Sequence, residues 1–99
     1  MTKIERHEMT WTSGHLTIRI AITFDTSFGI VEHLAVESVS PERARLPITE
    51  TGYRSHFVHP GTVAAYGGPV AATRALLDDA AASKEWQDHL AASSQGSLF

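Results

Sequence analysis

Strict alternation of apolar and polar residues over residues 16–24 constrains the fold of this chain more than any other feature of its sequence. One face of the segment carries only apolar side chains, those of Leu16, Ile18, Ile20, Ile22 and Phe24. The opposite face carries His15, Thr17, Arg19, Ala21 and Thr23. A period of two with branched aliphatic residues on one side is typical of a strand that buries one face. The segment therefore predicts a half-buried strand that supplies one half of a core.

A hairpin is predicted immediately before this strand, because Ser13 and Gly14 have the chemistry of a two-residue turn. The register that follows places Thr12 opposite His15, Trp11 opposite Leu16, Met9 opposite Ile18 and Glu8 opposite Arg19. Apolar residues then meet on one face, and a carboxylate meets a guanidinium on the other. A slip by one residue would destroy both matches, so the pattern favours this pairing.

A third strand over residues 30–39 follows the turn residues 25–29 and completes an antiparallel meander. We pair Phe24 with Ile30, which leaves Glu32 on the apolar face and suggests a bulge there. Residues 40–59 lose this periodicity and contain Pro41 and Pro47. Residues 46–49 are the candidate for a short fourth strand at the edge, because the residue before a proline favours extended geometry.

The C-terminal part of the chain predicts two helices. Pro69 follows two glycines and suits a first helical position, and apolar residues then recur at helical spacing. Ser83 suits the N-cap of a second helix from residue 84 to about residue 92. The helical half of the core is predicted to consist of Val70, Leu76, Leu77, Trp86 and Leu90.

The predicted architecture is a single two-layer α+β domain over residues 1–92, followed by a flexible tail at residues 93–99. Helices cover one face of a three-stranded antiparallel sheet, or of a four-stranded one if residues 46–49 pair. Such a sheet leaves two open edges, so pairing with a second copy as a homodimer is expected.

Composition limits the classes of partner. The formal net charge is −3, which gives none of the basic surface typical of nucleic-acid binding, so direct binding to DNA or RNA is not expected. The chain has no cysteine and therefore no thiolate ligand or nucleophile.

The first eleven residues are too charged for a secretory signal, and no apolar run reaches the ~20 residues of a membrane span. We expect a cytoplasmic protein without a membrane segment.

The segment TETGYRSHF, residues 49–57, is the best candidate for a functional surface, within a connection that we place at residues 43–59. The candidate binding residues are Glu50, Thr51, Tyr53, Arg54 and His56. Tyrosine and arginine are common at binding hot spots, glycine permits close backbone approach, and histidine titrates near neutral pH. In the structural alternative the threonines are turn residues, Tyr53 and Phe57 fill the core, and Glu50 braces Arg54.

Catalysis and metal binding have weaker signals. His56 and His59 form an HxxH pair, but the following proline favours an extended segment, in which the two rings diverge. Zinc needs three or four ligands, more than this pair supplies. Ser55 and His56 do not form a nucleophile–base pair, because neighbouring side chains of an extended chain point opposite ways. Asp78 and Asp79 suit a solvated helix face. We assign no catalytic residue, cofactor or metal; the alternative function is a small metal-dependent or acid–base enzyme using Glu50, His56 and His59.

The C-terminal sequence QGSLF, residues 95–99, resembles the short peptide by which bacterial replication and repair proteins dock on the sliding clamp. The resemblance implies that Leu98 and Phe99 would anchor in an apolar pocket of the clamp. Gly96 departs from the pattern, which has leucine there, and this loss would weaken binding. The alternative is that Leu98 and Phe99 fold back onto the domain.

The layout as a whole resembles an uncharacterised family of small proteins of bacterial plasmids, phages and other mobile elements. The matching features are LPITETGYRSHF at residues 46–57, the GGP sequence at residues 67–69 with Trp86, and the Ser-Leu-Phe end. The resemblance implies a bacterial accessory protein and no particular activity. Together with the candidate surface it leads us to expect a non-enzymatic module that binds a protein partner through residues 43–59.

Overall fold

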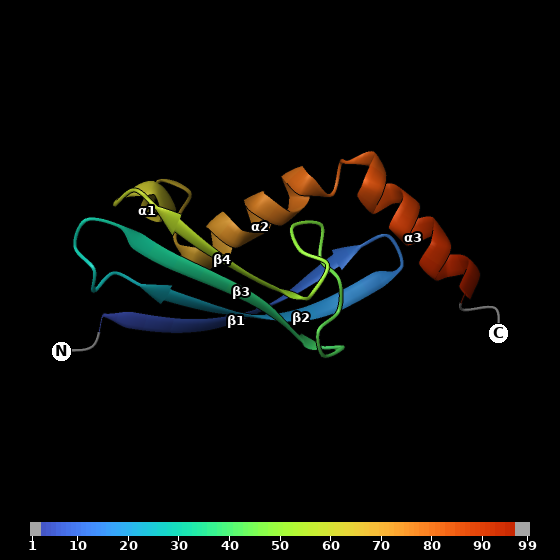
Figure 1. The fold of residues 1–99 in the computed structure, drawn as a ribbon, viewed down its shortest axis with the longest axis horizontal. Helices are drawn as coiled ribbons and strands as arrows, with labels where there is room; N and C mark the ends of the chain where they lie inside the picture. The colour runs from blue at the N-terminus through green and yellow to red at the C-terminus, as the bar shows by residue number, and fades with distance from the viewer. Residues whose placement is uncertain (1–2, 97–99) are drawn as a thin grey trace.

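The computed structural model describes residues 3–96, which form a four-stranded antiparallel sheet with helices on one face (Figure 1). The strands are β1 (Ile4–Ser13), β2 (Leu16–Asp25), β3 (Glu32–Ser40) and β4 (Tyr53–Val58). The helices are α1 (Thr62–Ala65), α2 (Pro69–Ala80) and α3 (Lys84–Gly96). The strands lie in the order β1-β2-β3-β4, so β1 and β4 are the edges. The predicted α+β class is confirmed, and the sheet has a fourth strand, which lies at residues 53–58.

The β1–β2 hairpin keeps the predicted faces but not the predicted partners. Its turn residues are Gly14 and His15, so Trp11 lies opposite Ile18 and Met9 opposite Ile20. The register is thus shifted by two residues, which leaves every side chain on its predicted face. Arg19 still donates a hydrogen bond to Glu8, at 2.6 Å, but it does so diagonally across the pair.

The β2–β3 connection is longer than predicted. Phe24 pairs with Leu34, and Ile30, which we had placed opposite Phe24, is 82% exposed. The shift is again an even number of residues, so the apolar faces of the two strands still coincide. The irregularity in the pairing lies between Arg19 and Ile20, and not at Glu32 as predicted.

The prediction of an edge strand at residues 46–49 was wrong, whereas the extended geometry expected just before Pro60 is present. Leu46 and Thr49 form an isolated bridge that closes a tight turn, and they add no edge strand. The fourth strand is instead β4, which contains the residues that we had placed at the centre of a loop. It pairs with β3 along its length, with Arg54 opposite Val36 and His56 opposite Leu34.

The core lies between the sheet and α2–α3. Ile18, Ile20 and Ile22 of β2 are fully buried, as the alternation predicts, and they meet Leu77 of α2 in one cluster. Val70 and Leu90 pack against this cluster while remaining partly exposed, whereas Leu76, which we had placed in the core, is half-buried and does not belong to it.

Two tryptophans join the sheet to the helices. The rings of Trp11 and Trp86 lie 5.7 Å apart, and each side chain is 1% exposed. Trp86 Nε1 donates to Ser13 Oγ at 2.9 Å. Trp11 Nε1 donates to Asp78 Oδ1 at the same distance, so Asp78 is more than a solvated residue of the helix surface. Satisfying both indole N–H groups allows these large side chains to be buried.

Helix α3 begins as predicted but ends later. Ser83 Oγ accepts a hydrogen bond from Trp86 N at 3.2 Å, which is the expected capping contact. The helix continues to Gly96, so residues 93–96, which we had assigned to a flexible tail, have helical backbone. Leu98 and Phe99 lie outside the described residues. Within residues 3–96, no helix combines the length and apolar character that crossing a membrane requires.

Candidate functional site

Strand β4 separates the predicted site residues onto the two faces of the sheet. Tyr53, Ser55 and Phe57 lie on the outer face, which carries no helix, whereas Arg54 and His56 lie on the inner face. The separation follows from the two-residue period of a strand. The segment is therefore one strand with two different surfaces, and the predicted residues do not form a single cluster.

The connection before β4 is a compact structural element. Gly52 has φ +80° and lies so close to Arg43 that an added Cβ would stand 2.6 Å from a backbone carbon. Thr49 Oγ1 donates to Tyr53 O at 2.9 Å, and Thr51 N donates to Thr49 Oγ1 at 3.3 Å. These contacts agree with the structural alternative for Thr49 and Thr51. They fix the point at which β4 begins.

Glu50 does not brace Arg54, as the structural alternative had expected it to. Its carboxylate is the nearest acidic group to Arg45, with Oε1 at 3.8 Å from Nη2, and its side chain is 82% exposed. An ion pair of this length and exposure contributes little to stability. Within residues 3–96, Arg54 has no carboxylate partner.

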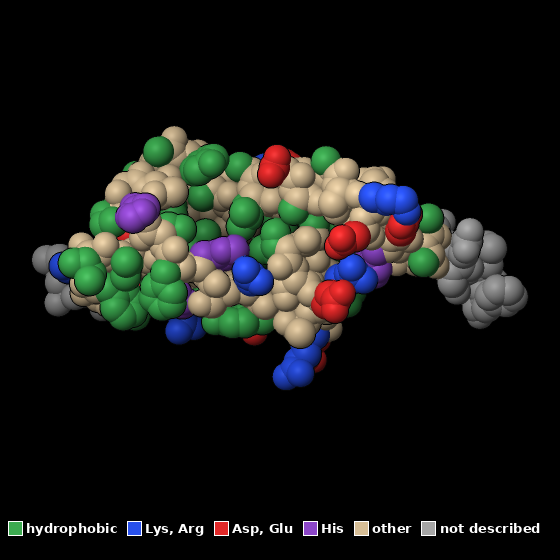
Figure 2. Space-filling view, turned by 45° about the horizontal axis from the view of Figure 1, so that its top comes forward, with side chains coloured by type: hydrophobic (Ala, Val, Ile, Leu, Met, Phe, Trp, Pro, Cys, Tyr) green, Lys and Arg blue, Asp and Glu red, His purple; other side chains and the backbone are tan. Residues whose placement is uncertain are grey.

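The outer face carries an aromatic patch, which we define as Phe28, His33 and Phe57. The Phe57 ring lies 4.8 Å from His33 and 6.0 Å from Phe28. Ser55 Oγ and His33 Nε2 are 2.8 Å apart and share a hydrogen bond. Phe57 is nevertheless 64% exposed and Phe28 52% exposed, and Figure 2 shows hydrophobic side chains gathered at this end of the molecule. The patch is ordered by its own contacts but still open to a partner.

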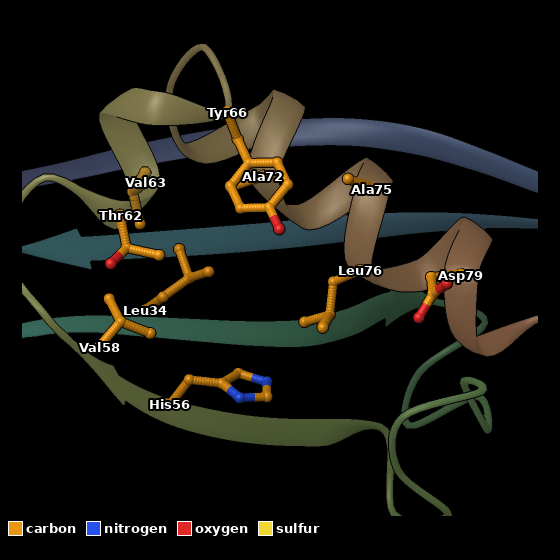
Figure 3. A pocket seen from close by; sticks show the side chains of 10 residues that line it. All are labelled: Leu34, His56, Val58, Thr62, Val63, Tyr66, Ala72, Ala75, Leu76 and Asp79. Atoms are coloured by element: carbon orange, nitrogen blue, oxygen red, sulfur yellow. The ribbon is translucent and has the colours of Figure 1, made fainter.

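The inner face carries a groove, which we call the inner groove, between β3–β4 and the helices. Helix α2 packs over β1 and β2, so the inner side of β3 and β4 is only partly covered. The groove measures about 520 Å³. Leu34, His56 and Val58 form its sheet side, and Tyr66, Leu76 and Asp79 stand on its helix side (Figure 3).

His56 is the most unusual group in the inner groove. Its Nε2 atom is buried and has no hydrogen-bond partner within the described part of the chain. Burial lowers the pKa of His56 below its usual 6.5, and the positive charge of Arg54 and the nearby His33 lower it further. The imidazole is therefore uncharged at neutral pH. An unpaired buried nitrogen costs about 1–3 kcal/mol, so this group would gain from a partner.

The outward edge of β4 is free for backbone pairing. Ser38 N donates to Gly52 O at 2.8 Å, which fixes the phase of the β3–β4 ladder. In an antiparallel pair, hydrogen-bonded positions alternate, so Arg54 and His56 pair with β3 while Ser55 and Phe57 point their N–H and C=O groups away from it. The threonines already occupy Tyr53 O. Ser55 and Phe57 therefore present the open backbone groups of this edge.

The three residues of the enzyme alternative lie in different parts of the fold. Glu50 lies beside Arg45 in the connection, His56 lies in the inner groove, and His59 follows the end of β4. Between residues 3 and 96, no three histidine, aspartate or glutamate side chains stand together as metal ligands.

Sequence reasoning missed the surroundings of β4. Phe28, His33, Tyr66 and Asp79 were not candidates, although all four line the aromatic patch or the inner groove. Only the β3–β4 pairing brings His33 next to Phe57, and the sequence analysis did not predict that residues 53–58 pair with β3.

Comparison with known proteins gives one informative result. The family model described as the KlcB third domain matches residues 4–86, which include all four strands and the first two helices. KlcB is a plasmid-associated protein. No curated protein and no solved structure matches the chain.

Proposed function

The chain belongs to the KlcB third-domain family, and from this membership and the geometry of β4 we propose that it is a non-enzymatic module that binds a protein partner along the β4 edge. The partner contributes an extended segment that pairs with Ser55 and Phe57 as an added strand. The plasmid association of KlcB supports a role as a bacterial accessory protein of a mobile element, working in the cytoplasm.

The observation that carries this proposal is the unprotected state of the β4 edge. Proteins usually blunt such edges with charges, prolines or a covering element. The opposite edge, β1, follows this rule with Glu5, Arg6 and Glu8. Between Tyr53 and Val58, by contrast, Arg54 is the only permanently charged residue, and exposed aromatic side chains flank it.

The two surfaces beside β4 support recognition of side chains. Successive residues of an added strand face opposite sides of the sheet. Residues on the outer side would meet the aromatic patch, and those on the inner side would reach the open mouth of the inner groove. Backbone pairing would supply affinity, and these two surfaces would supply specificity.

Ser55→Pro tests the proposal directly. Ser55 N–H points away from β3, so proline at this position removes an outward donor without removing a bond of the β3–β4 ladder. Ser55→Ala is the matched control, because it also loses the hydrogen bond with His33 but keeps the backbone N–H. Wild type and both variants are used to capture partners from a bacterial lysate, with thermal melting of each.

A partner held by wild type and Ser55→Ala but lost by Ser55→Pro at similar melting temperature supports the proposal. Equal capture by all three proteins contradicts it. A chain ending at Ser94 enters the same experiment, because the clamp-like sequence ends in Leu98 and Phe99. Loss of sliding clamp with this truncation alone would make the tail a second binding element.

A further inference from the structure

We propose that the strand added to β4 is β4 of a second copy, related by a two-fold axis at Ser55, so that two four-stranded sheets join into one. The inference rests on the proposed function of the β4 edge and names its partner. A two-fold contact of this kind uses the same surface on both chains, so the surface must be complementary to itself.

The sequence of β4 has this self-complementarity. Around Ser55 it reads Tyr53-Arg54-Ser55-His56-Phe57, with an aromatic residue two positions away on each side and a basic residue one position away on each side. When Ser55 faces Ser55 of the partner subunit, antiparallel pairing sets Tyr53 opposite the partner's Phe57. It sets Arg54 opposite the partner's His56. The open backbone groups of Ser55 fit the same register, because Ser55 becomes a hydrogen-bonded position.

On the outer face, the pairing would cover apolar surface that a single chain exposes. Tyr53 is 49% exposed and Phe57 64% exposed, and aromatic cross-strand pairs stabilise a sheet. Two Tyr53–Phe57 contacts would form, one on each side of the axis. They would connect the aromatic patches of the two copies into one surface that includes Phe28.

On the inner face, Arg54 would stand opposite the partner's His56 at a position that is not hydrogen-bonded, where side chains approach most closely. Arg54 lacks a carboxylate partner within residues 3–96, and burial keeps the His56 ring uncharged at neutral pH. A guanidinium can donate to a neutral imidazole but is repelled by a protonated one.

This contact makes the dimer dependent on pH. The groups near His56 are Arg54 on β4, His33 on β3, and Tyr66 and Asp79 on the helix side of the inner groove. Asp79 is the only acidic group among them, and burial and the two basic neighbours hold the pKa of His56 below its usual value. Pairing with the partner's Arg54 therefore weakens as the pH falls through the lowered pKa of His56.

A cysteine placed at the two-fold axis tests the register. The chain has no cysteine, so Ser55→Cys introduces the only thiol. Facing residues at a hydrogen-bonded position have Cα atoms about 5.5 Å apart, within the range of a disulfide. Thr12→Cys, on the other edge strand, is the control. Each variant is oxidised with glutathione disulfide and run on a non-reducing gel, and sedimentation of wild type and Ser55→Pro is measured across a dilution series at pH 7.5 and 5.5.

The expected result is a wild-type dimer that Ser55→Pro makes monomeric, with covalent dimer from Ser55→Cys and little from Thr12→Cys. A wild-type monomer at every concentration overturns the inference, as does a dimer that survives Ser55→Pro or equal cross-linking of the two cysteine variants. If the inference fails while a different protein is still captured in a Ser55→Pro-sensitive manner, the proposed function stands. If neither dimer nor capture responds to Ser55→Pro, both fail.

Discussion

Gly52→Ala should destabilise this domain far more than the same substitution at Gly29. Gly52 has φ +80° and Gly29 has φ +81°, so alanine suffers the same backbone strain at both positions, about 1–2 kcal/mol. The two positions differ in the space available to an added Cβ atom. A Cβ at Gly29 would meet nothing within 4 Å, whereas at Gly52 it would lie 2.6–2.8 Å from the backbone of Arg43.

The backbone of Arg43 cannot rotate away as a flexible side chain would. Its displacement would also disturb the bond from Ser38 N to Gly52 O, which places the start of β4. Overpacking of this kind costs about 1–3 kcal/mol, which brings the total for Gly52→Ala to roughly 2–5 kcal/mol. At roughly 4–8 °C per kcal/mol for a domain of this size, the melting temperature should fall by roughly 8–40 °C.

Differential scanning calorimetry of wild type, Gly29→Ala and Gly52→Ala measures this difference. Gly29→Ala should lower the melting temperature by roughly 4–16 °C, the cost of strain alone. Equal losses in the two variants would refute the reasoning, because they would mean that the contact with Arg43 contributes nothing. Gly52→Ala should also weaken capture of any partner that depends on the β4 edge.

Three further predictions concern the helices and the histidines. Ser83→Ala removes the cap of α3 and should cost about 1 kcal/mol in urea denaturation, without changing the fold seen by circular dichroism. Trp86→Phe loses the bond to Ser13 and part of the indole volume, and should cost about 1–3 kcal/mol in the same assay; a neutral result would mean that the indole N–H is not needed. Burial lowers the pKa of both His56 and His89, so the unfolded chain binds more protons than the folded one below pH 6.5. Stability should therefore be full above this pH and fall as the pH drops from 6.5 toward the lowered pKa values, and His56→Gln should reduce that fall in urea titrations at pH 7.5 and 5.5.

The faces of the strands were predictable from the sequence because burial selects for alternation, and β2 buries one face along its whole length. The pairing register was not. Shifts by two or four residues keep every apolar side chain on the core face, so alternation cannot distinguish them. Turn geometry decides instead, and the positive φ of Gly14 belongs to a turn that starts one residue later than the one we predicted.

Strand β4 could not be read from the sequence for a different physical reason. It is an edge strand whose inner face is only partly covered, so Arg54 and His56 occur where a central strand would carry aliphatic residues. Of the residues that suggested a surface, Tyr53 lies on the outer face of the sheet, and Arg54 and His56 lie on the inner face. Which of these side chains faces the groove and which faces outward depends on the pairing of β4 with β3. No local pattern in the sequence indicates that pairing.

The two buried tryptophans make the junction of the sheet with α3 observable by itself. The chain contains two tryptophans, and both lie at this contact with ring centres 5.7 Å apart. Intrinsic emission and the near-ultraviolet dichroism of coupled indoles therefore report on this end of the molecule and are blind to the aromatic patch, which contains none. Amide hydrogen exchange along β4, measured in parallel with tryptophan emission, would show whether β4 opens before α3 detaches from the sheet. A domain with two such separable signals can reveal unfolding in stages without any added label.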